Sequence, residues 1–185
     1  MHRDALIIVH PHYGCTSRAA MPRARNMRQL NKGQEWAREN PLAEKILREH
    51  NGRNAVYMVE ALLAKERLET VFMLDHDCFS KYRWDELIEL GRPMGPELAA
   101  RVVEEVERIK KGLASWFIDN FGEGHLLSIN HRNTGPYFRK NFDFPINMRI
   151  VLIGEYLHAC IDEVSHSLSV MSFNNVHVDE EKCAS

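Results

Sequence analysis

Four clusters of polar residues that are able to do chemistry follow apolar runs in this sequence. His10 and His12 follow ALIIV at residues 5–9, and the cluster DHDC follows TVFML at residues 70–74. The cluster NHRN follows HLLSI at residues 125–129, and the cluster GEYLHAC, which ends at Cys160, follows RIVLI at residues 149–153. Histidine, cysteine and carboxylate side chains transfer protons, attack carbonyl carbons or bind metal ions. We therefore expect the reactive residues at the ends of these runs.

The elements that position these residues alternate along the chain. The four apolar runs, with NVHV at residues 175–178, read as strands, and residues 133–145 read as a loop. The patterns predict helices at residues 41–51, 54–67, 97–120 and 158–171. Such alternation indicates a three-layer α/β/α fold with a mainly parallel sheet, and 185 residues suit one domain, residues 1–185. Ligands bind outside the carboxyl ends of such strands, so we expect the polar clusters to converge there.

Composition narrows the class of protein. The net charge of −2 does not favour a nucleic-acid partner, and no apolar run is long enough for a membrane span. The four cysteines form no CxxC pair and the N-terminus does not read as a signal peptide, so we expect a reduced, cytoplasmic protein. Residues 16–34 carry five basic residues and no acidic one, among them Arg18. This segment is either an anion site, or a solvated basic face or mobile lid.

The order of several segments resembles the isochorismatase-like cysteine hydrolases. Gly154 follows a strand, and Cys160 comes six residues later with the apolar Ile161 after it, which is similar to the spacing around that family's nucleophile. The segments DALIIVHPH, NAVYMVEALLAKERLETVFMLDHD and VHVDEEKCAS are similar to other parts of that family. The resemblance implies an isochorismatase-like, Rossmann-like sheet and a homo-oligomer. It departs at two positions: the family's catalytic aspartate falls on His10, and its catalytic lysine falls near Asn130.

These observations predict that the protein is a hydrolase. It is expected to act on a small, anionic substrate and to need no cofactor. In this interpretation Cys160 is the nucleophile, because a cysteine in the first turn of a helix is stabilised as the thiolate. His10 replaces the aspartate as the general base, and Asn130 holds the substrate or an oxyanion. The residues expected to bind or orient the substrate are His12, Asp75, His76, His131, Arg132 and Arg18.

Two alternatives remain open from the residues alone. The first is a metal-dependent hydrolase, because imidazole and carboxylate groups bind zinc and other divalent metals. Its candidate ligands are His10, His12, Asp75, His76 and Asp77. The second alternative is a non-catalytic member of the fold that binds a ligand or a partner.

Overall fold

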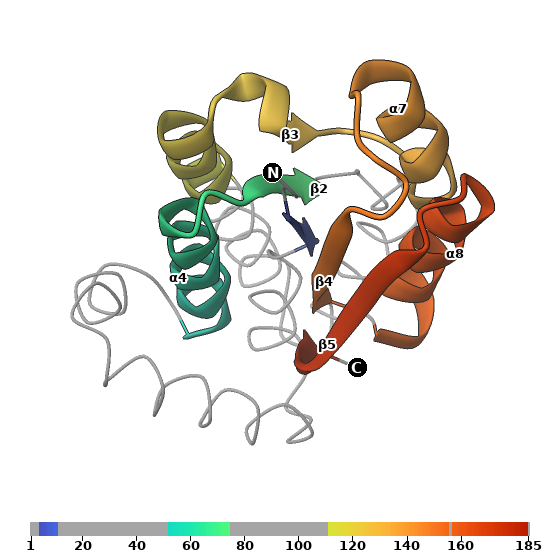
Figure 1. The fold of residues 1–185 in the computed structure, drawn as a ribbon. Helices are drawn as coiled ribbons and strands as arrows, with labels where there is room; N and C mark the ends of the chain where they lie inside the picture. The colour runs from blue at the N-terminus through green and yellow to red at the C-terminus, as the bar shows by residue number, and fades with distance from the viewer. Residues whose placement is uncertain (1–3, 11–51, 75–110, 156, 185) are drawn as a thin grey trace, which may run out of the picture.

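The computed structural model describes residues 4–10, 52–74, 111–155 and 157–184. The predicted helix at 41–51, the basic segment at 16–34 and the first part of the predicted helix at 97–120 lie outside these residues. The elements described below carry the labels of Figure 1.

In the part of the chain that the structure describes, five parallel strands form one sheet, as the apolar runs predict. In the sheet the order is β3-β2-β1-β4-β5. The chain therefore builds the sheet from β1 toward one edge and then returns to the other side of β1. Ligands bind at such a reversal of strand order, which lies here between β1 and β4. The strands are β1 (Ala5–Val9), β2 (Thr70–Leu74), β3 (Leu126–Leu127), β4 (Arg149–Glu155) and β5 (Asn175–Ala184).

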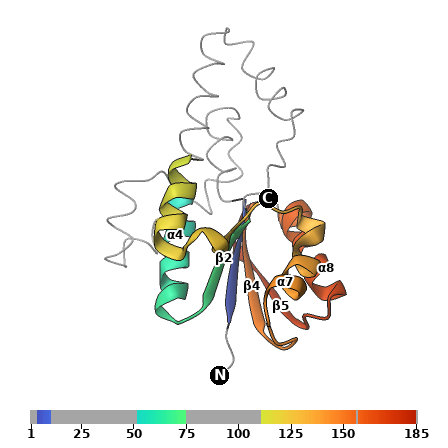
Figure 2. The ribbon, with the colours of Figure 1, turned by 90° about the horizontal axis from the view of Figure 1, so that it is seen from above.

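Helices lie on both faces of the sheet, which Figure 2 shows nearly edge-on. Helix α4 (Gly52–Glu66) and the helical segment 111–121 lie on one face, and helices α7 (Thr134–Asn141) and α8 (Asp162–Val170) lie on the other. Successive residues of a strand point to opposite faces, so β1 contributes to both cores. Leu6 and Ile8 pack with α4, while Ile7 packs with residues of α7 and α8. This burial on both sides explains why β1 is a continuous apolar run.

Several predicted elements match the structure closely, and others need correction. Strands β1 and β2 have the predicted bounds, and α4 covers the predicted helix at 54–67 within two residues at each end. The loop predicted at 133–145 is wrong, because α7 occupies most of it and buries Phe138 against the sheet. Strand β5 has 10 residues, and β3 is reduced to two residues after the 3₁₀ turn η3 (Glu123–His125).

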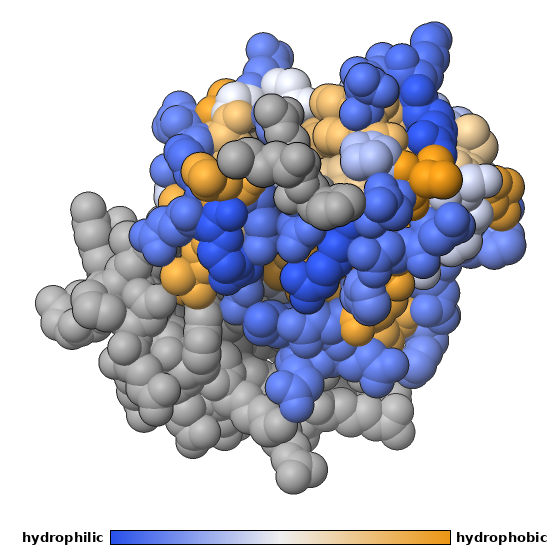
Figure 3. Space-filling view, viewed as in Figure 1, coloured by the Kyte–Doolittle hydropathy of each residue, from blue (hydrophilic) through white to orange (hydrophobic). Residues whose placement is uncertain are grey.

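The surface seen in Figure 3 is mostly hydrophilic, with apolar side chains in separate patches. Large apolar residues of the described chain that remain exposed include Leu68, in the turn between α4 and β2, and Val170, at the end of α8. Single exposed apolar residues are ordinary on a folded surface. Among the residues that the structure describes, none belongs to a helix with the length and apolar character needed to cross a bilayer.

Candidate functional site

The site begins where β1 ends. His10 follows Val9 directly, is fully buried, and donates its backbone N–H to the carbonyl of Leu74 at 3.1 Å. Its φ of 48° lies in the left-handed region, which non-glycine residues rarely adopt. Unfavourable backbone conformations are found most often at functional sites. The backbone conformation of His10 and its hydrogen bond to Leu74 therefore fix the His10 side chain inside the protein at the carboxyl edge of the sheet.

Gly154 allows β4 to end beside the end of β1. It pairs with Val9, and a Cβ atom added at Gly154 would lie 2.0 Å from the carbonyl oxygen of Val9. Its φ of 133° is a conformation that favours glycine. Only glycine therefore fits this close approach of β4 to β1. The chain then enters the π-helical turn η5 (Leu157–Ile161), which carries Cys160 and precedes α8.

A second set of contacts positions His131 on the 3₁₀ turn η4 (His131–Asn133). The hydroxyl of Ser167 on α8 donates to the carbonyl of Arg132 at 2.8 Å and accepts the N–H of Gly135 at 2.9 Å. A Cβ atom added at Gly135 would lie 2.0 Å from the carbonyl oxygen of Ser167, so α7 and α8 pack backbone to backbone here. These contacts hold η4 against α8 and place the buried His131 beside it.

His10, His131 and Cys160 come together at this edge of the sheet. The two imidazole rings meet edge to face, with centroids 4.7 Å apart, and a hydrogen bond joins Nε2 of His10 to Nε2 of His131. One ligand atom from each of the three residues, including Sγ of Cys160, lies within 4.8 Å of the other two. Both histidines are buried and Cys160 is half-buried. We call these three residues the His–His–Cys cluster.

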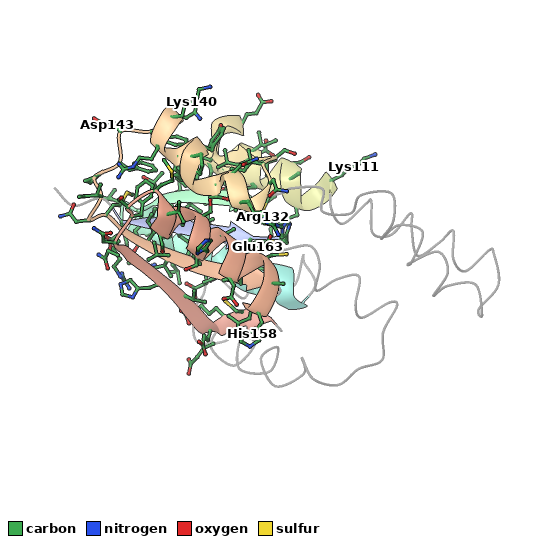
Figure 4. The ribbon with its side chains drawn as sticks, turned by 90° about the vertical axis from the view of Figure 1, so that its right-hand side faces the viewer. Lys111, Arg132, Lys140, Asp143, His158 and Glu163 are labelled. Atoms are coloured by element: carbon green, nitrogen blue, oxygen red, sulfur yellow. The ribbon has the colours of Figure 1, made fainter. Side chains whose placement is uncertain are left out.

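A carboxylate lies on the other side of His131. Nδ1 of His131 is 3.2 Å from Oε2 of Glu163, and Oε1 of Glu163 accepts hydrogen bonds from Nε and Nη2 of Arg132 at 3.1 and 2.8 Å. Figure 4 shows Arg132 and Glu163 side by side, with His158 away from them. A carboxylate at Nδ1 favours the tautomer that carries its proton there. The second ring nitrogen, Nε2, then faces His10.

Electrostatic interactions in the site favour charged His131 and Glu163. Burial lowers the pKa of His131, but hydrogen bonding and charge interaction with Cys160, and then with Glu163, outweigh burial and raise that pKa above its usual value. The hydrogen bond from Arg132 is the main reason that the pKa of Glu163 is lowered, and His131 acts in the same direction. Cys160 and Glu163 thus stabilise the protonated form of His131 relative to an isolated imidazole.

The predicted site residues fall into three groups according to their positions in the structure. It brings together Cys160, His10 and His131, and it places Arg132 next to them through Glu163. The exposed Asn130 caps η4, where its side chain accepts the N–H of Arg132 at 3.0 Å. The predicted residues that lie outside the described part of the chain are His12, Arg18, Asp75, His76 and Asp77.

Sequence reasoning missed Glu163. The available signal was its spacing, because a residue three positions after Cys160 lies on the same side of a helix. His158, also close to Cys160 in the sequence, is exposed, and its Nδ1 is 4.0 Å from Oδ2 of Asp162. Closeness to Cys160 in the sequence therefore did not distinguish Glu163, which contacts His131, from His158, which does not line the cluster.

The described surface has a hollow beside the site and a larger one away from it. A groove of about 610 Å³ between η4, α7 and α8 is lined by Arg132 and Glu163 but not by Cys160. A larger hollow of about 1040 Å³ is lined partly by Asp4, Thr70 and Arg149, at the beginnings of the strands. The smaller groove thus borders the outer side of the Arg132–Glu163 pair, and the larger hollow reaches the opposite edge of the sheet.

Comparisons with protein-family models, with curated proteins and with solved structures gave no significant match for this chain.

Proposed function

We propose that this protein is a hydrolase that uses Cys160 as a nucleophile on a small, anionic substrate with an ester or amide carbonyl. The observation that carries the proposal is the order thiol, imidazole, carboxylate from Cys160 through His131 to Glu163. A nucleophile, a base and a group that orients the base is the arrangement that activates a thiol or hydroxyl for acyl transfer. The position of the three groups beyond the carboxyl ends of parallel strands supports it further.

In the first step Nε2 of His131 gives up its hydrogen bond with His10 and accepts the proton of Cys160, and the sulfur attacks the carbonyl carbon of the substrate. The tetrahedral intermediate collapses to a thioester as the leaving alcohol or amine takes the proton from His131. In the second step His131 removes a proton from water, which attacks the thioester and releases the acid. The thiol then recovers its proton. Glu163 stabilises the imidazolium in both steps, and Arg132 holds Glu163 in place.

The proposal gives His131 the role of base that the sequence suggested for His10. The assignment to His131 is supported by its interactions with both Cys160 and Glu163, which give this imidazole a thiol and an orienting carboxylate. His10 then serves as a positioning residue that supports the edge of the His131 ring. The guanidinium of Arg132, with 79% of its side chain exposed, is the group of the described site that favours an anionic substrate.

The proposal includes the three-layer, isochorismatase-like arrangement that the sequence resembles. In that resemblance the family's aspartate and cysteine correspond to His10 and Cys160, and its lysine falls near Asn130, next to His131. The proximity of these three regions supports the resemblance. A descendant with two histidines in place of the aspartate and the lysine would rely on a Cys–His pair rather than on the family's triad.

Burst kinetics with an activated ester test the proposal. The full chain, reduced and treated with a chelator, is mixed with p-nitrophenyl acetate and with the p-nitrophenyl monoester of succinic acid. We expect a burst of about one p-nitrophenolate per chain, a thioester on Cys160 by mass spectrometry, and faster acylation by the succinate ester. Loss of the base lowers the rate of such steps by about 10²- to 10⁴-fold, so His131→Gln should remove most of the burst.

A cysteine elsewhere in the described chain provides the matched control. Cys183 is buried and its Sγ is 3.1 Å from the carbonyl oxygen of Asp179, so Cys183→Ala should leave the burst unchanged, while Cys160→Ser abolishes it. Circular dichroism and thermal melting check that each variant folds. A folded Cys160→Ser variant that keeps the full burst, or a wild type whose Cys160 reacts no faster than a free thiol, would exclude the proposal.

A further inference from the structure

We infer that His10, His131 and Cys160 form a binding site for Zn²⁺, and that bound Zn²⁺ blocks Cys160 as a nucleophile. The binding itself depends only on the cluster, whereas the inhibition rests on the function proposed above. The His–His–Cys cluster is the set of histidine, cysteine and carboxylate side chains in the described chain whose ligand atoms converge closely enough to hold one ion.

The chemistry of the three donors selects the metal. Imidazole nitrogen and thiolate sulfur suit zinc and neighbouring transition metals, whereas calcium and magnesium prefer oxygen ligands. Two histidines and one cysteine satisfy three of the four positions of a tetrahedral zinc ion. The remaining position is open to water or another ligand, as in zinc sites with three protein ligands.

The separations of the donors are close to those of a zinc site. Bond lengths of about 2.0–2.1 Å to nitrogen and about 2.3 Å to sulfur place the ligands of a tetrahedral zinc ion about 3.3–3.7 Å apart. The donors of the cluster all lie within 4.8 Å of one another, with Nε2 of His10 and Nε2 of His131 in direct contact. Side-chain movements of about 1 Å would therefore open the two imidazoles and draw in Cys160 around an ion.

Glu163 supplies the outer support that zinc-bound histidines generally have. Its Oε2 lies 3.2 Å from Nδ1 of His131, which favours a proton on Nδ1 and leaves Nε2 as the metal-binding atom. Arg132 holds Glu163 with two hydrogen bonds to Oε1, so the carboxylate is fixed before any ion binds. The burial of both histidines limits competition from water for these nitrogens.

Zinc binding and thiol chemistry exclude each other at this cluster. A sulfur atom bound to zinc shares its electron pair with the metal, and Nε2 of a zinc-bound His131 cannot accept a proton. The metal-free protein is therefore the active form, and Zn²⁺ is a reversible inhibitor that competes with the substrate for Cys160. Release of the ion restores both groups without any redox step.

Metal titration of the full chain, without a histidine tag, tests the inference. The chelator-treated, reduced protein is titrated with Zn²⁺ against a chromophoric chelator and, separately, with Co²⁺ as a spectroscopic probe. We expect one tight Zn²⁺ per chain and a thiolate-to-cobalt charge-transfer band. Cys160→Ser should remove that band, and Cys160→Ser, His131→Gln and His10→Asn should each weaken Zn²⁺ binding at least 100-fold. Asparagine is chosen at residue 10 because it tolerates a positive φ.

Two further variants serve as matched controls. The exposed His158→Gln and the buried Cys183→Ala should retain both the tight Zn²⁺ and the cobalt band. One equivalent of Zn²⁺ should also suppress iodoacetamide labelling of Cys160 in the wild type, and EDTA should restore it. Glu163→Gln should weaken Zn²⁺ binding by about 10- to 100-fold, which is the usual loss for such a supporting group.

The outcomes separate this inference from the proposed function. If metal-free Cys160 forms a thioester but Zn²⁺ does not bind, or binds equally well to folded cluster variants, the zinc site is refuted and the hydrolase proposal stands. If Zn²⁺ binds at the cluster and the metal-free thiol is unreactive toward the esters, the zinc site stands and the hydrolase proposal fails. If bound Zn²⁺ leaves the labelling of Cys160 unchanged, the inferred inhibition is refuted.

Discussion

The imidazole rings of His10 and His131 meet at an interplanar angle of 86°, although 121 positions separate the two residues in the chain. His10 follows β1, and His131 follows β3, with β2 between these strands in the sheet. The segment after β3 therefore passes the end of β2 to bring His131 to His10. This crossing joins the two regions at which the cluster forms.

Glu163 should control the reactivity of Cys160 without contacting the substrate. We expect Glu163→Gln to slow acylation of Cys160 by p-nitrophenyl acetate about 10-fold, because a neutral amide stabilises the His131 imidazolium less than a carboxylate does. Asp162→Asn changes an adjacent residue that is exposed, and it should leave the rate within about twofold. Equal rates for Glu163→Gln and the wild type would remove Glu163 from the mechanism.

Gly154 should be indispensable for the junction of β1 and β4. We expect Gly154→Ala to lower the free energy of unfolding by about 3 kcal/mol or more, because the new Cβ atom overlaps the Val9 carbonyl at a positive φ. Urea denaturation measures the change. Gly124→Ala is the matched control, because a Cβ atom added there meets nothing within 4 Å, and it should change stability by less than about 0.5 kcal/mol.

Ser167 should stabilise the packing of η4 and α7 on α8. We expect Ser167→Ala to lower the free energy of unfolding by about 1–3 kcal/mol, because the carbonyl of Arg132 and the N–H of Gly135 lose the partner that Ser167 provides. Ser169→Ala on the same helix removes an exposed hydroxyl and should change stability by less than about 0.5 kcal/mol. Similar values for the two variants in thermal and urea unfolding would contradict this role.

Lys182 should stabilise the sheet through the buried carboxylate of Glu60. Its Nζ is 3.0 Å from Glu60 and 3.1 Å from Asp179. Because Lys182→Met leaves the buried Glu60 without this cation, we expect a loss of about 1–3 kcal/mol at pH 7. Lys140→Met changes an exposed lysine on α7 and should have little effect.

The same pair predicts a dependence on alkaline pH. Burial lowers the pKa of Lys182, but Glu60 and then Asp179 outweigh burial and raise that pKa above its ordinary value of 10.5. A raised pKa contributes stability that is complete below the unfolded-state pKa and is lost as the pH rises through the folded-state pKa. The difference in stability between wild type and Lys182→Met should therefore be constant from about pH 7 to 9 and decrease above pH 10.5. A difference that already falls between pH 7 and 9 would contradict the assignment.

The sequence by itself determined the elements that depend on local pattern. Strands β1 and β2 are continuous apolar runs because helices cover both faces of the sheet, and the runs mark their bounds directly. Cys160 could also be identified as a candidate from the sequence, because its spacing from Gly154 can be read along the chain. Helix α7 could not be predicted in this way, since its eight residues are polar on average and its position depends on burying Phe138 against other elements.

Only the tertiary structure decided which polar residues act together. Four clusters ended four apolar runs, but the sequence contained nothing that placed His131 rather than Asn130 at His10, or Glu163 at His131. Local periodicity reflects interactions over a few residues, so the sequence alone is enough to predict the helices and strands that depend on it. The partners of a side chain across the sheet depend on strand order and on close backbone contacts such as Gly135 with Ser167, which arise only when the whole chain packs.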